Sequence, residues 1–229
     1  MRPTLLIDAD DTLWENNVYF ERAIARFISF LNHHEFSPEQ VRGVLNDVER
    51  ECIVKHGYGL HSFAHALVDT FERLSPIPVT TELHAQVISF TEIIENHDIE
   101  FLPEVPETLE HLSRSNRLIL VTKGALEEQS GKVERSGVKK YFESVEIVAE
   151  KKPDVYAQLA DKYDCNHSHT WMIGNSPKSD INPALEAGLH AVFVPHRNTW
   201  MLERGELQPE AGNGRLLQVE TFGKLREVF

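Results

Sequence analysis

Hydrophobic and polar positions follow two different patterns along the chain. Residues 4–7 form a short apolar run of strand length, and acidic residues follow it directly. From residue 17 to about residue 97, apolar residues recur three and four positions apart, which is the period of an amphipathic helix. This stretch predicts about four helices with no strand between them.

Two sites in this stretch carry helix-start signals. Ser37 is followed by Pro38, a pair that predicts an N-cap residue and the first residue of a helix. Thr80 or Thr81 is expected to cap the fourth helix.

Beyond residue 101, strand-like and helix-like segments alternate. Strands are predicted at 118–121, 145–148, 171–173 and 190–194, and helices at 126–136, 153–163 and 179–187. Such alternation predicts a parallel sheet with helices on both faces. We therefore expect an α/β fold, a Rossmann-like doubly wound parallel sheet, in a discontinuous domain of residues 1–16 and 100–229. An all-α domain of residues 17–99 is inserted into it.

Composition and charge limit the classes of function. The 229 residues are 41% hydrophobic and 26% charged, as in folded globular proteins, so a disordered chain is excluded. We expect no membrane partner, because no run approaches the roughly 18 apolar residues of a span, and we see no signal peptide. The net charge of −13 disfavours nucleic acid, whose phosphates would be repelled. Cys52 and Cys165 lie far apart, which indicates a reducing cytoplasm rather than a disulfide framework.

Polar residues cluster where the predicted strands end. In open α/β sheets, ligands bind beyond the carboxyl ends of the strands. The segments at these ends are 8–12, 122–124, 150–153 and 174–180, and they supply carboxylates, hydroxyls and lysines. We expect these groups to meet at one edge of the sheet.

The carboxylates suggest a metal ion. Asp8 and Asp10 would point to the same side of an extended stretch, and Asp11 and Asp180 add to the negative charge. Crowded like charges are unfavourable, and Mg²⁺, which prefers oxygen ligands, would offset them. The alternative is a solvated turn, but the position directly after an apolar strand favours the metal site.

Other strand ends suggest phosphate binding. Thr122 either caps a turn or binds a phosphoryl oxygen with help from the backbone N–H groups of Lys123 and Gly124. Lys152 precedes the predicted helix start, where a lysine is unfavourable for the helix dipole and is therefore a candidate functional residue. Lys151 is the competing choice.

Taken together, four segments resemble the motifs of the haloacid dehalogenase-like superfamily, which consists mostly of phosphohydrolases. They are LLIDADDTLW, LILVTKG, KKPDVY and WMIGNSPKSDINPALEAG, in that order along the chain. The helical insert between the first two is similar to the α-helical cap of the subfamily that includes phosphoglycolate phosphatases, 5′-nucleotidases and 2-haloacid dehalogenases.

The resemblance implies a role for each matching residue. Asp8 would be the nucleophile that forms an aspartyl-phosphate, and Asp10 would protonate the leaving oxygen and then deprotonate the attacking water. Thr12 would orient the loop. Thr122 and Lys152 would hold and neutralise the phosphoryl oxygens.

The resemblance also implies a Mg²⁺ site formed by Asp8, the backbone carbonyl of Asp10, Asn175 and Asp180. The family usually has Asp where this chain has Asn175, so one ligand lacks its formal charge. The dehalogenase branch is expected to lack an acid/base Asp two residues after the nucleophile. The presence of Asp10 therefore favours phosphate ester hydrolysis.

The sequence thus predicts a Mg²⁺-dependent phosphohydrolase that acts on a small phosphomonoester. A phosphosugar mutase of the same fold and a non-catalytic phosphate-binding protein stay open as alternatives. The substrate, the cap residues that face it and the oligomeric state are not predicted. His61 and His65, four apart on a predicted helix, are interpreted as a solvent-facing pair, and Trp14 could close over a substrate or pack in the core.

Overall fold

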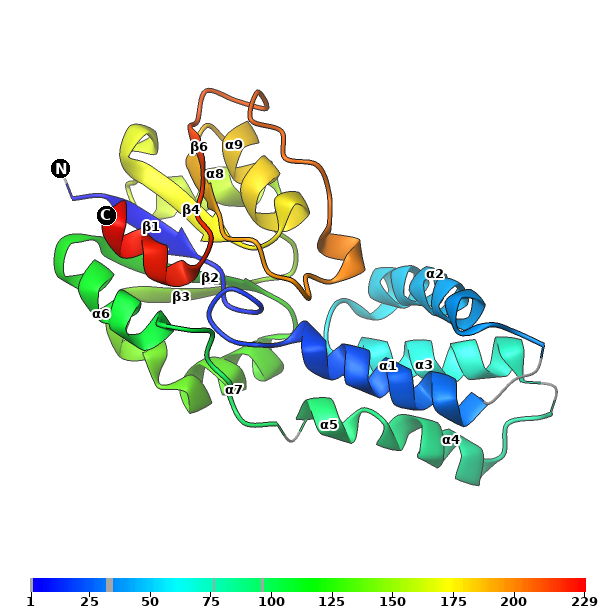
Figure 1. Ribbon diagram of the computed structural model, residues 1–229. Coiled ribbons are helices and arrows are strands. Elements are labelled where there is room, and N and C mark those ends of the chain that lie inside the picture. Colours follow the sequence, from blue (N-terminus) through cyan, green and yellow to red (C-terminus); the bar gives the residue numbers. More distant parts are fainter. Residues whose placement is uncertain (1, 32–34, 76, 96) are drawn as a thin grey trace. The chain divides into compact units, whose positions relative to one another are not determined.

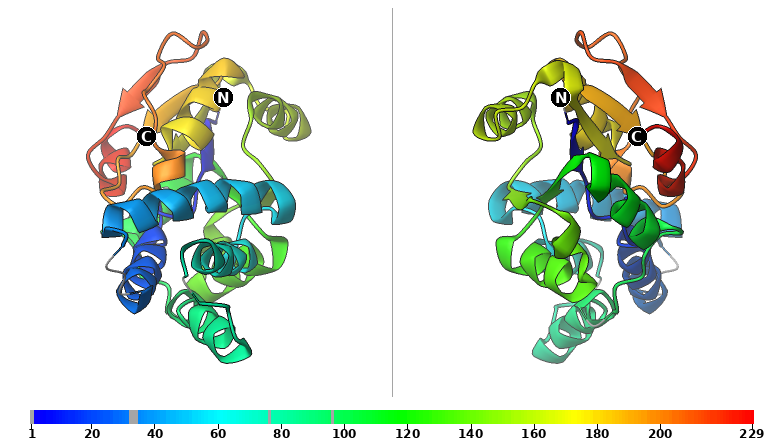
Figure 2. Two further views of the ribbon diagram at one scale, coloured as in Figure 1. Left: turned by 90° about the vertical axis from the view of Figure 1, so that its right-hand side faces the viewer. Right: turned by 90° about the vertical axis from the view of Figure 1, so that its left-hand side faces the viewer.

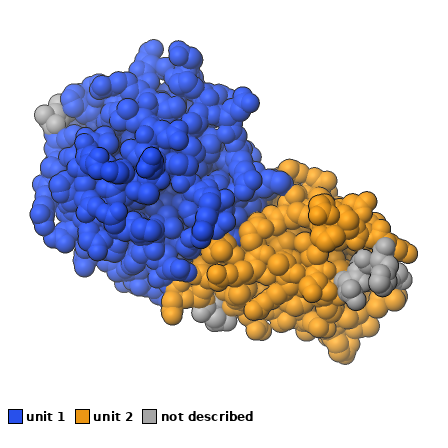
Figure 3. Space-filling view, in the orientation of Figure 1, with its two compact units in different colours: residues 1–17, 99–229 blue, residues 18–98 orange. Residues whose placement is uncertain are grey.

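The structure is a computed structural model that describes residues 2–31, 35–75, 77–95 and 97–229. It divides into two compact units, Met1–Asn17 with Ile99–Phe229, and Val18–Asp98 (Figure 3). These divisions lie one residue from the ends predicted for the two domains. Whether each unit is an independent folding domain stays a prediction.

A parallel sheet forms the centre of the first unit. Its strands are β1 (Thr4–Ile7), β2 (Arg117–Lys123), β3 (Ser144–Val148), β4 (Thr170–Gly174), β5 (His190–Phe193) and β6 (Leu216–Gln218). The spatial order is β3-β2-β1-β4-β5-β6, with every neighbouring pair parallel. The predicted doubly wound α/β fold is therefore confirmed, although the sequence did not reveal β6.

Helices cover both faces of this sheet (Figures 1 and 2). On β1, Leu5 and Ile7 point into one hydrophobic core and Leu6 points into another, as the two-residue period of a strand requires. The first core includes α6 (Val105–Ser115), α7 (Leu126–Ser136) and the terminal 3₁₀ turn Phe222–Glu227, whereas the second includes α8 (Pro153–Lys162) and α9 (Asn182–Glu186). Because both faces are buried, β1 can be a continuous apolar run.

The helix predicted at 179–187 is present, but only its second part is α-helical. The chain forms a π-helix at Pro177–Ile181, which continues directly into the short helix α9. Pro183 lacks the N–H that a continuous helix would need there, so it stands near the start of a new helix. Such π-type turns are frequent at functional sites.

The second unit is all helical and has its own core. Its helices are α1 (Asn17–Leu31, of which Asn17 belongs to the first unit), α2 (Pro38–His56), α3 (Leu60–Leu74), α4 (Thr81–Ser89) and α5 (Glu92–Glu95). Phe27, Leu45 and Leu67 are fully buried in this core. The predicted caps are confirmed: Ser37 forms a capping box, and the Thr80 side chain accepts from Leu83 N–H.

The fourth predicted helix of this unit is divided in two. α4 ends at Ser89, and α5 begins at Glu92. The Thr91 hydroxyl donates to the Ile88 carbonyl at 2.8 Å, a local bond that competes with the regular helical pattern.

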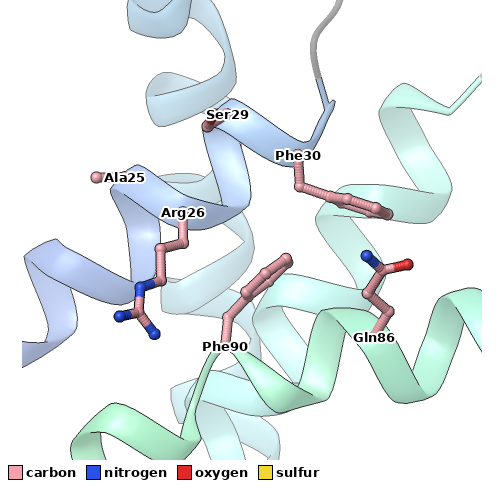
Figure 4. A pocket seen from close by; sticks show the side chains of 6 residues that line it. All are labelled: Ala25, Arg26, Ser29, Phe30, Gln86 and Phe90. Atoms are coloured by element: carbon pink, nitrogen blue, oxygen red, sulfur yellow. The ribbon is translucent and has the colours of Figure 1, made fainter.

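A surface pocket of about 490 Å³ lies within the helical unit. It is lined by Ala25, Arg26, Ser29, Phe30, Gln86 and Phe90 (Figure 4). The ring centroids of Phe30 and Phe90 are 5.5 Å apart. The pocket combines an apolar wall with one guanidinium group, and the sequence pattern gave no sign of it.

Two further observations concern the length of the helices and the two cysteines. Across the part of the chain that the structure describes, no helix is both long enough and apolar enough to cross a membrane. Cys52 and Cys165 are both free thiols, as their separation in the sequence predicts.

Candidate active site

Asp8 lies directly beyond the carboxyl end of β1. Its backbone N–H donates to the Ile173 carbonyl at 3.0 Å, which extends the pairing with β4 by one residue. Its buried carboxylate accepts the Thr12 hydroxyl at 2.7 Å on Oδ2 and lies 2.5 Å from Lys151 Nζ on Oδ1. Both carboxylate oxygens are thus held in fixed positions by these two side chains.

Lys151, rather than Lys152, is the lysine of this site. Its buried Nζ lies between two carboxylates, 2.5 Å from Asp8 Oδ1 and 2.7 Å from Asp180 Oδ1. Lys152 is exposed, as the residue that precedes α8. Lys152 was predicted because a lysine directly before a helix is unfavourable for the helix dipole. In the loop before α8, however, the side chain of Lys151 enters the site.

Burial and the neighbouring charges together determine the pKa values of Asp8 and Lys151. Burial and the carboxylate of Asp180 raise the pKa of Asp8 to about 7, although Lys151 and Thr12 oppose the shift. Burial by itself would lower the pKa of Lys151, but the two carboxylates outweigh it and hold this pKa well above its ordinary value. When all three groups are ionised, one ammonium faces two carboxylates and leaves a net charge of −1.

The loop after β4 completes this cluster. Thr12 Oγ1 lies 3.3 Å from Asn175 Oδ1, and Asn175 Nδ2 donates to Thr199 Oγ1 at 3.0 Å. Asp180 Oδ2 accepts the backbone N–H of Ser176 at 2.9 Å. A side chain on Gly174 would overlap the Asp180 carboxylate, so the loop requires glycine at this position.

The predicted metal ligands fit a hard divalent cation in their chemistry. Asp8, Asn175 and Asp180 supply buried carboxylate and amide oxygens, the ligand type that Mg²⁺ prefers. The net negative charge of the cluster would also be offset by a cation. Thr12 contacts both Asp8 and Asn175, so the structure brings the two ends of this ligand set together.

The Asp10 carboxylate is held by a different set of partners. It accepts from Trp14 Nε1 at 2.8 Å, Gln129 Nε2 at 3.0 Å and Lys132 Nζ at 3.0 Å. Burial would raise the pKa of Asp10, but Lys132, Gln129 and Trp14 together lower it. Thr122 joins the same network, because its hydroxyl donates to Gln129 Oε1 at 3.0 Å. Asp10 is therefore stabilised as a carboxylate.

Two predicted phosphate-binding residues have other partners in this structure. Lys123 Nζ lies 2.6 Å from the carboxylate of Glu203 and donates to Ser179 Oγ at 3.0 Å. The Gly124 N–H donates to the Val148 carbonyl at 3.1 Å, within the pairing of β2 and β3. In this conformation, the Gly124 N–H is therefore not available to an oxyanion.

Sequence reasoning missed Gln129, Lys132 and Glu203. Gln129 and Lys132 lie on the buried side of α7 together with Val133. Polar residues at helix positions that should be apolar were a usable signal for both. Glu203 lies in a C-terminal region whose pattern predicted no element, so no comparable signal existed. Trp14 is fully buried, and its indole N–H positions Asp10.

Comparisons with known proteins identify the family and the fold of this chain. A family model described as haloacid dehalogenase-like hydrolase matches residues 3–188. Human N-acylneuraminate-9-phosphatase is 29% identical over 100 residues, which are 42% of this chain and 40% of the relative, so the match spans well under half of either protein.

Solved structures share the fold. A haloacid dehalogenase-like hydrolase from Xanthomonas campestris has a TM-score of 0.83 at 24% identity, covering 100% of this chain and 95% of its own. L-2-haloacid dehalogenase from Xanthobacter autotrophicus has a TM-score of 0.67 at 15% identity, covering 100% and 98%. These identities establish the fold alone, whereas the family model covers most of the chain. The chain belongs to the haloacid dehalogenase-like hydrolase family.

Proposed function

We propose that this hydrolase is a Mg²⁺-dependent phosphatase that cleaves a small phosphomonoester through an aspartyl-phosphate. The single observation that supports this most directly is the Asp8 carboxylate, fixed at the end of β1 by Lys151 and Thr12. A positioned carboxylate beside an ammonium is suited to attack phosphorus, because the ammonium can neutralise charge on the phosphoryl oxygens.

The reaction has two displacements. In the first, an Asp8 oxygen bonds to phosphorus, the ester bond breaks, and the leaving oxygen takes a proton from Asp10. In the second, water attacks the aspartyl-phosphate, Asp10 recovers a proton from that water, and Asp8 and inorganic phosphate are released. The lowered pKa of Asp10 suits its second role, since an ionised carboxylate accepts the proton. Its first role requires that Asp10 hold a proton when the substrate is bound, which the three donors around it oppose.

Asp8, Asp180, Asn175 and the backbone carbonyl of Asp10 would hold the metal ion. When bound, Mg²⁺ would neutralise negative charge shared by the nucleophile and the substrate phosphate. Lys151 would keep Asp8 and Asp180 in position whether or not the ion is bound, because it contacts both.

Phosphate ester cleavage is favoured over carbon–halogen cleavage by two arguments. Asp10 supplies the acid/base group that an ester oxygen needs when it leaves, whereas a halide leaves without a proton. The relative from the human proteome is a phosphatase by name, whereas the dehalogenases match in fold alone. We further propose a small phosphorylated metabolite as partner, no nucleic acid or membrane, and a cytoplasmic location.

The test is phosphate release from p-nitrophenyl phosphate with Mg²⁺. We expect EDTA to abolish it and Asp8→Asn to abolish it without unfolding the protein. Asp154→Asn, which changes an exposed carboxylate in the first turn of α8, is the matched control and should retain activity. Near-normal turnover by Asp8→Asn would refute the nucleophile assignment.

A substrate panel separates the alternatives. It should include phosphoglycolate, nucleoside monophosphates, hexose phosphates and N-acylneuraminate 9-phosphate, the last because of the human relative. An isomerised hexose phosphate in place of free phosphate would identify a mutase. Chloride release from 2-chloropropionate would identify a dehalogenase. Mg²⁺ binding with no turnover of any compound would support a non-catalytic role.

A further inference from the structure

A second group of potential metal ligands lies beside the candidate active site but shares no side chain with it. Asp11 and Glu15 belong to the segment after β1, and His196 belongs to the segment after β5. One ligand atom from each of these three residues lies within 4.8 Å of the other two. All three belong to the first compact unit, so the group is part of a single body.

The three side chains are buried, and two of their atoms lack partners. The side chains of Asp11 and His196 are 7% and 9% exposed, and that of Glu15 is 13% exposed. Glu15 Oε2 and His196 Nδ1 are buried and make no hydrogen bond. Such orphan atoms are rare inside proteins and call for an explanation, one of which is the binding of a metal ion.

Short distances within the group do not amount to satisfied hydrogen bonds. His196 Nδ1 is 3.7 Å from Asp11 Oδ1, which is beyond hydrogen-bond range. His196 Nε2 is 3.3 Å from Glu15 Oε2, an ion-pair distance for a protonated imidazole, but burial lowers the pKa of His196 and favours its neutral form, and Glu15 Oε2 makes no hydrogen bond. Arg197, the nearest guanidinium, is 82% exposed and 4.0 Å from Glu15. Two buried carboxylates are therefore left without a buried cation.

Asp11 is fixed in its position by the backbone. Its Oδ1 accepts the N–H groups of Asn16 and Asn17 at 2.9 and 3.0 Å, and its own φ of 60° is in the left-handed region. The side chain is therefore pre-positioned, and the same segment presents Glu15 four residues later. A ligand site needs such preorganisation, because it lowers the entropy cost of binding.

The donor set determines which ion would fit. An imidazole nitrogen with two carboxylate oxygens suits Zn²⁺ and similar transition metals, whereas Mg²⁺ takes oxygen ligands. With bonds of about 2.0–2.2 Å, the ligands of a tetrahedral Zn²⁺ lie about 3.3–3.6 Å apart. The distances between the ligand atoms, which are 4.8 Å or less, must therefore shorten by at most roughly 1.5 Å, within the reach of side-chain rotation.

We propose that Asp11, Glu15 and His196 form a binding site for a divalent transition-metal ion, with Zn²⁺ as the best fit, separate from the Mg²⁺ centre of the proposed phosphatase. The ion bonds to one imidazole nitrogen and to one oxygen of each carboxylate, and a water molecule takes the fourth position. The site joins the segment after β1 to the segment after β5.

The experiment measures Zn²⁺ binding by calorimetry, in a background that lacks a competing surface site. His61 and His65 are exposed in α3, and their Nε2 atoms are 3.2 Å apart, so they offer such a competitor. The background protein is therefore the double variant His61→Ala/His65→Ala. We expect it to bind one equivalent of Zn²⁺, and X-ray absorption to show one imidazole bound to the ion.

Three further variants, made in this background, decide the outcome. Glu15→Gln and His196→Ala should each lower Zn²⁺ affinity at least about tenfold. Arg197→Ala, an exposed neighbour, should leave the affinity unchanged. Glu15→Gln preserves shape, so it keeps the test valid if His196→Ala folds poorly.

A fourth variant separates this site from the proposed phosphatase. Asp8→Asn should abolish phosphate release and leave Zn²⁺ affinity unchanged. No Zn²⁺ binding by the background protein would overturn the proposal, as would Zn²⁺ binding that Asp8→Asn removes and Glu15→Gln does not. Neither of these results would affect the phosphatase assignment, which depends on p-nitrophenyl phosphate turnover.

Discussion

Lys151 and Lys152 form a natural matched pair for testing the candidate site. They are adjacent in sequence and carry the same side chain, but Lys151 Nζ is buried between Asp8 and Asp180, whereas Lys152 is exposed. Lys151→Met removes the ammonium and leaves two buried carboxylates facing each other. Lys152→Met removes a solvated charge and nothing else that the structure shows.

The expected difference in stability between Lys151→Met and Lys152→Met follows from the burial of the Lys151 side chain. Removal of one partner from a buried ion pair costs about 3–5 kcal/mol of stability, whereas a surface substitution usually changes it by about 0.5 kcal/mol or less. The deficit of Lys151→Met should shrink at low pH, because a carboxylate with a raised pKa takes up a proton in the folded state. The limiting slope is about 1.4 kcal/mol per pH unit for one such group.

The assay is urea denaturation of both variants at several pH values, followed by tryptophan fluorescence, together with p-nitrophenyl phosphate turnover. We expect Lys151→Met to lose stability and turnover, and Lys152→Met to resemble the wild type. If Lys151→Met is too unstable at pH 8, the comparison at pH 5 remains informative. Loss of turnover in Lys152→Met with retention in Lys151→Met would refute the reasoning.

Three other predictions concern buried polar groups. Lys132→Met should raise the pKa of Asp10, which Lys132 now lowers, so the limb of the kcat/KM profile at which Asp10 loses the proton needed for the first displacement should move to higher pH. Burial raises the pKa of Glu49 from 4.5 to about 7, so its ionisation destabilises the fold as pH rises through this range. Glu49→Gln should therefore raise the free energy of unfolding at pH 8 by about 3 kcal/mol, as measured by urea denaturation. At pH 4 the variant and the wild type should differ little. Gly174→Ala should abolish turnover and lower the melting temperature, because the added methyl group overlaps the Asp180 carboxylate.

Each of these predictions has an outcome that contradicts it. An unchanged kcat/KM profile in Lys132→Met would mean that the Asp10 proton does not control either limb. Equal effects of Glu49→Gln at both pH values would show that its charge is not the cause. For Gly174→Ala, the control is Gly43→Ala in α2, where an added methyl group meets nothing within 4 Å; equal behaviour of the two variants would contradict the overlap argument.

Local patterns predicted the fold to a large extent. The central strand Thr4–Ile7 and the helix Leu126–Ser136 appear with the predicted ends, because an apolar run and a C-terminal glycine are signals within one short segment. The helix predicted at 179–187 begins as a π-helix, the last residues form a short 3₁₀ helix at Phe222–Glu227, and β6 was not predicted. The π-helix before Pro183 has a wider turn than the period of an α-helix describes. The strand β6 depends on its pairing with β5, which the periodicity of a single segment does not show.

The site was predicted in its location rather than in its contacts. Segments at the strand ends do bring Asp8, Asn175 and Asp180 together, which follows from the parallel order of β1 and β4. The choice between Lys151 and Lys152 needed the direction of one side chain in a loop, and the dipole argument could not supply it. The contact of Lys132 with Asp10 could not be predicted, because it depends on how α7 packs against the segment after β1.

The place of β1 in the sheet has a consequence for synthesis on the ribosome. β1 emerges first, yet its partners are β2, more than a hundred residues later, and β4, which ends at Gly174. Val18–Asp98 is continuous and has local helical contacts, which favour early folding, whereas the N–H and C=O groups on both edges of β1 stay unpaired until β2 and β4 are available. Exposed strand edges promote aggregation, so a slow or interrupted translation before residue 174 should make the nascent chain dependent on chaperones.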